Sequence, residues 1–288
     1  MKKSILSVLL VLVSFCASAN LQKPTGTWQG VIIQKGKTID AGTLIYVEFE
    51  EADGIISGTT REERYDSPNY SVKSISGKLI DGKLSFKHLV ELKSKKSSRE
   101  KWCRISADLR HNKETGYLIG SYVSTDCRRV MGEIILYRMD FKMTEEAEME
   151  SSQIWFKRFV QDYKDGLSAP AIRKIERDNF VFEPIYFDFD KHDVRMEHNH
   201  FLDRMIKIVK GHSDLRVQVT GHTDSDGTNR YNDSLSMRRA DAITRYFVLR
   251  GLSADRLEID FKGESQPADT NDTPQGKQRN RRVDFKFI

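Results

Sequence analysis

An acidic loop around residue 224 carries side chains whose types and spacing suit ligand binding. The loop spans residues 221–227 (GHTDSDG) and follows an alternation of apolar residues at 215–219 that is typical of a buried strand. Its glycines, Gly221 and Gly227, permit tight turns that other residues resist. Asp224 places a carboxylate in this loop, and a carboxylate is suited to pairing with an ammonium group of a ligand.

Arg239 lies on the apolar side of the helix that is expected after the loop. Helical spacing groups it with Leu235 and Ile243, whereas Arg238 falls on the polar face. A charge on a core-facing stripe needs a partner, because an unpaired buried charge is costly. A guanidinium holds a carboxylate through two parallel hydrogen bonds, which a lysine cannot form. Two interpretations follow: Asp224 and Arg239 form a salt bridge with each other, or they bind a ligand that carries both an ammonium and a carboxylate.

Five segments in the C-terminal third occur in the order found in a known family. They are YFDFDKHDVR at 186–195, GHTDSDG at 221–227, YNDSLSMRRADAI at 231–243, GESQP at 263–267 and NRRV at 280–283. Together they resemble the OmpA-like peptidoglycan-binding domain, which also occurs in Pal-type lipoproteins and in stator proteins of the MotB kind. The resemblance covers about residues 185–288, and the N-terminal part is assigned to no family.

The resemblance implies which residues hold the ligand. In that family, an aspartate after GHT and an arginine in the LSxxRA block hold the diaminopimelate of the peptidoglycan stem peptide. The matching positions here are Asp224 and Arg239, and supporting contacts are implied for Asp188, Asn232 and Arg281. Diaminopimelate keeps a free amino-acid end with an ammonium and a carboxylate on one carbon, so its charges complement those of an aspartate and an arginine.

The pattern of residues 181–288 predicts an α+β domain in which a mixed sheet carries helices on one face. Strands are expected near 185–190, 215–222, 256–262 and 282–288, and helices near 196–210 and 233–250. Asn232 is placed just before the second helix, where its side chain caps free amides or reaches the ligand. Alternation along the last strand directs Arg281 and Arg282 to opposite sides, one toward the ligand and the other toward solvent.

The N-terminus has the pattern of a secretory signal peptide over residues 1–19. Two lysines precede a short apolar stretch, and a small-residue cleavage site (ASA) ends it. The alternative is a lipoprotein signal acylated at Cys16, which the bulky Phe15 disfavours. The apolar stretch is too short to span a bilayer as a helix. The signal predicts export, and the resemblance to the OmpA-like domain implies the periplasm of a Gram-negative envelope, in association with the cell wall and the outer membrane.

Charge and residue content argue against several classes of function. The formal net charge of +5 falls to +3 without the two lysines of the signal. This excess is too small to indicate nucleic-acid binding, and export removes such a partner. The sequence shows no pairing of a nucleophile with a base, no phosphate-binding loop and no spacing suited to a metal. We therefore expect no catalytic residue, no metal and no cofactor, whereas the oligomeric state stays open.

Two cysteines remain once Cys16 leaves with the signal. Cys103 and Cys127 form an even pair in an exported chain, which predicts a disulfide bond. Closing a loop of this size stabilises a fold by about 3 kcal/mol. A catalytic thiol is the alternative interpretation.

Residues 20–142 are predicted to form a β-rich domain. Short alternating runs recur about every ten residues, at 28–34, 43–50, 55–60, 70–79, 83–92, 101–109, 116–124 and 131–141. About eight antiparallel strands with short connections form a barrel or a sandwich. The alternation permits a soluble barrel with apolar residues inside or an outer-membrane barrel with apolar residues outside. Short strands and apolar faces interrupted by residues such as His88 favour the soluble barrel.

Residues 143–180 are predicted to connect the two domains. An amphipathic helix is expected at 144–163, with Trp155, Phe159 and Tyr163 on its apolar side. Glutamates crowd its start, where negative charge favours the helix dipole. A linker is expected after this helix.

These observations predict a non-catalytic envelope protein that binds peptidoglycan noncovalently through the diaminopimelate of the stem peptide. Binding would anchor the N-terminal β domain, or the outer membrane, to the cell wall. The β domain is expected to contact another envelope protein or a small ligand. The alternatives are an outer-membrane β-barrel tethered to the wall and an enzyme that acts on the wall.

Overall fold

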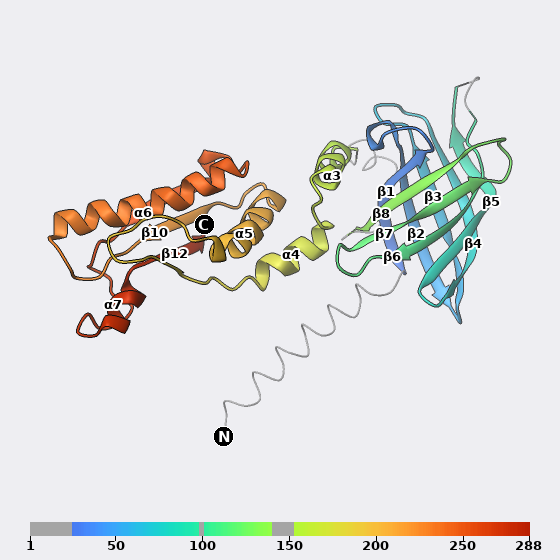
Figure 1. Ribbon diagram of the computed structural model, residues 1–288. Coiled ribbons are helices and arrows are strands. Elements are labelled where there is room, and N and C mark those ends of the chain that lie inside the picture. The colour runs from blue at the N-terminus through green and yellow to red at the C-terminus, as the bar shows by residue number, and fades with distance from the viewer. Residues whose placement is uncertain (1–24, 98–100, 140–152) are drawn as a thin grey trace. The chain divides into compact units, whose positions relative to one another are not determined.

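The computed structural model describes residues 25–97, 101–139 and 153–288 (Figure 1). The expected signal peptide, with Cys16, lies outside the described residues. The chain divides into two compact units, Met1–Ile172 and Arg173–Ile288. None of the helices in the described ranges has the length and apolar character that a membrane span needs.

The first unit contains a closed barrel of eight antiparallel strands (Figure 1). Each strand pairs with the next one in the chain, and β8 closes the barrel by pairing with β1 along residues 28–34. The strands are β1 (Gly26–Gln34), β2 (Thr43–Ala52), β3 (Ile55–Glu63), β4 (Tyr70–Ile80), β5 (Lys83–Lys95), β6 (Ile105–His111), β7 (Tyr117–Ser124) and β8 (Met131–Arg138). The prediction of eight antiparallel strands is confirmed, and of the two expected arrangements the barrel is the one formed.

The barrel interior is filled mainly by apolar side chains. Strand alternation turns one set of residues inward, including Trp28, Val47, Phe86 and Leu136, and all of these are buried. The intervening residues face outward, and several of them, such as Glu48, are exposed. Burial of the inward set stabilises the barrel, since each large apolar side chain removed from water contributes roughly 1.5–3 kcal/mol.

A helix covers part of the outer barrel surface. In α3 (Trp155–Lys164), Phe156, Phe159 and Val160 are buried and share one apolar cluster with outward residues of β1, β2, β7 and β8. Trp155 adds a hydrogen bond from Nε1 to the hydroxyl of Tyr46, at 3.1 Å. The amphipathic helix is therefore present from residue 155; residues 144–152 of the expected helix lie outside the described residues. A second helix, α4 (Pro170–Asp178), runs through the segment that we expected to be a linker.

The second unit is a four-stranded mixed sheet with helices packed against it (Figure 1). The strand order is β11-β10-β12-β9; β10 and β11 are parallel, whereas β12 is antiparallel to both of its neighbours. The elements are β9 (Ile185–Tyr186), α5 (Asn199–Gly211), β10 (Val217–Gly221), α6 (Asn229–Leu249), β11 (Leu257–Phe261), α7 (Pro274–Asn280) and β12 (Arg282–Phe287). The predicted α+β fold is confirmed. Two details differ, because β9 has only two residues and α7 was not predicted.

Candidate functional site

The acidic loop begins where β10 ends, at the centre of the sheet. Its backbone is fixed by two hydrogen bonds, from His222 N to Arg282 O at 2.9 Å and from Thr223 N to Gly263 O at 2.8 Å. Gly221 lies against helix α6: a Cβ atom at this position would stand 2.0 Å from the carbonyl oxygen of Ser236. Only glycine permits this close approach. The strand end and the helix are thereby held together, and the loop carries Asp224 into a largely buried position.

Arg239 is fully buried on helix α6, as the helical pattern predicted. All three of its guanidinium nitrogens donate to main-chain carbonyl oxygens: Nε to Lys191 at 2.9 Å, Nη1 to His222 at 2.8 Å and Nη2 to Asp188 at 3.2 Å. The guanidinium carbon also lies 5.3 Å from the centre of the Phe187 ring, within cation–π range. These contacts fix the position of the cation but supply no negative charge.

The carboxylate of Asp224 pairs with Arg281 rather than with Arg239. Nη1 of Arg281 lies 2.7 Å from Oδ2 of Asp224, and both side chains are largely buried. Among the described residues no ion pair joins Asp224 to Arg239, so the simple salt bridge between them is not formed. Burial holds the pKa of Arg239 well below its ordinary value, at about 10; Asp224 opposes this shift and Arg281 adds to it. The three charges are thus close enough to influence one another.

The position of Arg281 is fixed in part by helix α7, which directly precedes it in the chain. Its Nη2 atom donates to Oε1 of Gln278 on this helix, and its Nε donates to the carbonyl oxygen of Phe187 at 3.3 Å. A sequence signal for α7 was available, because Thr273 followed by Pro274 is typical of a helix start. The Thr273 hydroxyl accepts a hydrogen bond from the amide of Gly276, at 3.0 Å.

Several buried side-chain atoms around the acidic loop make no hydrogen bond within the described residues, among them Nδ1 of His222 and Nη1 of Arg282. Oγ1 of Thr223 and Oδ1 of Asn232 are buried and make no hydrogen bond within the described residues. The other side-chain atom of Asn232, Nδ2, donates to Oε2 of Glu264 at 2.5 Å. Buried polar atoms are normally satisfied, so each exception suggests a group that the protein alone does not provide.

Three details of the predicted site need correction. Asn232 lies inside α6 rather than before it, and the helix is capped instead by Thr228, whose hydroxyl accepts from the amide of Tyr231. Arg282 does not face solvent: it is 8% exposed and lies 2.9 Å from a carboxylate oxygen of Asp284. Asp188 contributes its main-chain oxygen to the site, whereas its carboxylate is exposed.

Comparisons with known proteins identify the second unit. The profile of the OmpA family matches residues 186–281. The peptidoglycan-associated lipoprotein of Haemophilus influenzae is 35% identical over 102 residues, which are 35% of this chain and 67% of that protein. That of Pseudomonas aeruginosa is 43% identical over 101 residues, covering 35% of this chain and 60% of that one. The solved structure of the Burkholderia pseudomallei peptidoglycan-associated lipoprotein is 28% identical, with a TM-score of 0.36, and aligns with 36% of this chain and 89% of its own.

The mixed sheet, the acidic loop and the buried arginine thus define an OmpA-like domain. The chain belongs to the OmpA family. It spans 60% of the Pseudomonas lipoprotein, and the N-terminal barrel lies outside residues 186–281, which the family profile matches. The relatives are proteins of Gram-negative envelopes, which identifies this chain as an exported protein of the periplasm or the outer membrane.

Arg239 is a positive charge that forms no ion pair among the described residues. Arg281 and Asp224 neutralise each other, while Arg239 is surrounded by neutral carbonyl groups. Two other acids in this region have partners: Lys277 Nζ lies 2.6 Å from the carboxylate of Asp226, and the carboxylate of Asp190 accepts a hydrogen bond from the hydroxyl of Tyr231. A buried, unbalanced cation is costly, and a bound carboxylate would remove that cost. The site is therefore suited to a ligand that adds a negative charge.

Proposed function

We propose that this protein binds peptidoglycan noncovalently, through the diaminopimelate of the stem peptide. One observation carries the proposal: Arg239 is a fully buried cation that lies beside the Asp224–Arg281 pair and forms no ion pair with any carboxylate of the described residues. Diaminopimelate offers an ammonium and a carboxylate on one carbon. Its ammonium suits Asp224, and its carboxylate suits the two arginines. The names of the relatives, peptidoglycan-associated lipoproteins, support the same ligand.

Binding would exchange partners within the site. Arg281 now occupies the carboxylate of Asp224, in the position that a ligand ammonium would take. When the ammonium binds, Arg281 would turn toward the ligand carboxylate and hold it together with Arg239. The unpaired Thr223 Oγ1 and Asn232 Oδ1 would gain partners among the polar groups of the ligand. In this proposal the protein is a binder, with no bond made or broken.

The test is a pull-down with purified sacculi. Asp224→Ala and Arg239→Ala should each weaken binding by about 2–5 kcal/mol, because loss of one partner leaves a desolvated charge uncompensated. Arg239→Lys should also bind poorly, since an ammonium cannot form the two-pronged contact. The matched control is Arg238→Ala, one residue away, where the guanidinium donates to the hydroxyl of Ser234 and lies 5.8 Å from the centre of the Tyr231 ring.

The comparison requires that each variant stays folded, as judged by circular dichroism. Arg239 holds three main-chain carbonyls, so Arg239→Ala is the variant at greater risk of unfolding. Asp224→Asn keeps the shape of the aspartate and provides the second test. If folded Asp224→Asn and Arg239→Lys proteins bound sacculi as well as the wild type, the proposal would be wrong.

We further propose that the barrel is a water-soluble domain in the periplasm and that the OmpA-like unit anchors it to the cell wall. Large apolar side chains fill its interior, helix α3 covers the apolar outward residues of β1, β2, β7 and β8, and other outward positions carry exposed charges such as Glu48 and Lys87. A membrane barrel would need the reverse pattern. Extraction of native envelopes without detergent should release the protein once the wall is digested. Release that required detergent even after digestion would support the outer-membrane alternative.

A further inference from the structure

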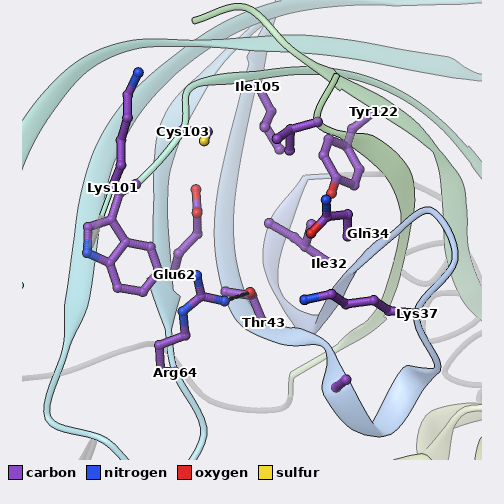
Figure 2. Close-up of a pocket in the computed structure, with 13 residues that line it drawn as sticks. Ile32, Gln34, Lys37, Thr43, Glu62, Arg64, Lys101, Cys103, Ile105 and Tyr122 are labelled. Carbon is purple, nitrogen blue, oxygen red and sulfur yellow. Dashed lines mark hydrogen bonds between the residues drawn. The ribbon is translucent and has the colours of Figure 1, made fainter. Parts of the chain in front are cut away.

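A polar-lined cavity opens at one end of the barrel (Figure 2). It has a volume of about 240 Å³ and lies where β1 and β3 end and where β2 and β6 begin. Its lining residues come from these strand ends and the adjoining loops, among them Ile32, Lys37, Glu62, Arg64 and Trp102.

Glu62, one of the lining residues of the cavity, belongs to a buried network of ionisable side chains. The ammonium of Lys73 lies 2.7 Å from Oε1 of Glu62, and the two side chains are 0% and 6% exposed. His88 stands beside them: its Nδ1 accepts from the amide of Ile105 at 3.3 Å, and its Nε2 lies 3.1 Å from the hydroxyl of Thr60. Because Nδ1 is an acceptor, this imidazole is neutral. Because His88 is neutral, the negative charge of Glu62 at the cavity is balanced by the ammonium of Lys73.

The opening carries an excess of positive charge. Three cations line it, Lys37, Arg64 and Lys101. Figure 2 shows Lys37 and Arg64 extending toward each other from opposite sides of the opening, whereas Lys101 extends away from it. Lys101 donates instead to the main-chain oxygen of Asp126, at 3.0 Å. Lys37 has no ion-pair partner among the described residues. Arg64 donates to the hydroxyl of Thr43, at 2.7 Å, and its guanidinium carbon lies 5.2 Å from the centre of the Trp102 ring, so that its charge stands at the opening. The positions of Lys37 and Arg64 suit an anionic group between them.

The walls below these cations are apolar or aromatic. Ile32, Ile105, Val130 and Tyr122 line the cavity, and all except Val130 are buried. Trp102 is 5% exposed, and its Nε1 atom is buried without a hydrogen-bond partner in the described part of the chain. A buried indole N–H without a partner is unusual, because tryptophan normally uses this donor. A cavity with apolar walls and a few convergent polar groups is the usual form of a small-molecule site.

From these features we propose that the barrel binds a small organic anion, whose apolar body enters between Trp102 and Tyr122 and whose acidic group lies between Lys37 and Arg64. The acidic group is a carboxylate or a phosphate monoester, which the same two cations would hold. The cavity volume of about 240 Å³ admits a small organic molecule. This size suits a chain of about eight carbons or a single substituted ring.

The test uses the full-length protein and three eight-carbon probes that differ only in their polar head. Octanoate, octyl phosphate and octylammonium are titrated by calorimetry, and tryptophan fluorescence provides a second readout. The two anions should bind and the ammonium should not. A preference for one of the anions would identify the acidic group of the natural ligand. The site is separate from Asp224, so Asp224→Asn should leave octanoate binding unchanged.

The Lys37→Gln/Arg64→Gln double variant should weaken binding of the preferred anion at least tenfold. Lys35→Gln is the matched control, because Lys35 is exposed in the same loop but does not line the cavity. Lys37→Gln alone should weaken binding several-fold, and as an exposed substitution it avoids any effect on folding. The proposal is overturned if neither anion binds at about 1 mM, if octylammonium binds as tightly as the anions, or if folded Lys37→Gln and the double variant bind like wild type.

Discussion

The two units each bury an ion pair, and the two pairs differ in what surrounds them. In the barrel, Lys73 and Glu62 lie 2.7 Å apart and balance each other, and the further cations at the opening are exposed. In the OmpA-like unit, Asp224 and Arg281 lie at the same 2.7 Å, but the further cation, Arg239, is fully buried. An exposed extra cation costs little, whereas a buried one is costly until an anion joins it.

The Lys73–Glu62 pair is therefore structural, and the proposed anion site lies next to it. The Asp224–Arg281 pair is itself part of the proposed peptidoglycan site. The barrel pair is held within strands β3 and β4, whose ladder fixes both side chains. The second pair joins a loop to the residue after α7, so Arg281 can change partners without breaking a strand. We therefore expect the barrel network to govern stability and the second network to govern binding.

Lowering the pH should destabilise the barrel more than the OmpA-like unit, and this is the largest of the predicted effects. Burial lowers the pKa of His88 from 6.5 to about 3, and Lys73 lowers it further whereas Asp126 opposes the shift. The unfolded chain then binds a proton that the folded barrel rejects, so the free energy of unfolding falls as the pH drops from 6.5 toward 3. The loss reaches up to about 5 kcal/mol for His88 alone.

The measurement is urea unfolding followed by tryptophan fluorescence at several pH values. All three tryptophans, Trp28, Trp102 and Trp155, lie in the first unit, so the signal reports the barrel alone. Burial raises the pKa of Glu62, which acts in the opposite direction because that contribution is lost as the pH rises. The control is His88→Gln, which keeps Glu62 and should show a much flatter profile below pH 6.5. If the free energy of unfolding fell in parallel for the wild type and for His88→Gln below pH 6.5, the prediction for His88 would be wrong.

The disulfide should give the next largest effect, again confined to the barrel. The structure confirms the predicted bond between Cys103 and Cys127, which joins residues 24 positions apart. A Cys103→Ser/Cys127→Ser variant should lose about 3 kcal/mol, because the unfolded chain regains the freedom of that loop. The same fluorescence titration measures the loss. Sacculus binding should be unchanged; a barrel equally stable with and without the bond would refute the prediction.

The smallest predicted effect concerns helix α7. Thr273→Ala removes the side-chain cap on the amide of Gly276 and should cost about 1 kcal/mol of local stability. Amide hydrogen exchange at Gly276 should become about fivefold faster, whereas Thr273→Ser, which keeps the hydroxyl, should exchange like wild type. Sacculus binding should fall only slightly, since the arginines and Asp224 are retained. Unchanged exchange in Thr273→Ala would show that the cap is unimportant.

The sequence predicted those features that depend on local alternation. The eight barrel strands and the inward position of Arg239 follow from periods of two and of about 3.6 residues. The pairing of Asp224 with Arg281 was not predicted, because it depends on α7, a helix of seven residues with no apolar stripe. The barrel cavity was not predicted either. Its polar residues come from strands far apart in sequence and meet only when the barrel closes.

The central claim is that Arg239 binds the carboxylate of the ligand. Stem peptides test this claim most directly. Two peptides that differ only in carrying diaminopimelate or lysine at the third position differ by that one carboxylate. Calorimetry on the wild-type protein should show the diaminopimelate peptide binding at least about thirtyfold more tightly, which corresponds to about 2 kcal/mol. The difference should shrink in Arg239→Lys and persist in Arg238→Ala. Equal affinity of the folded wild-type protein for the two peptides would contradict the claim.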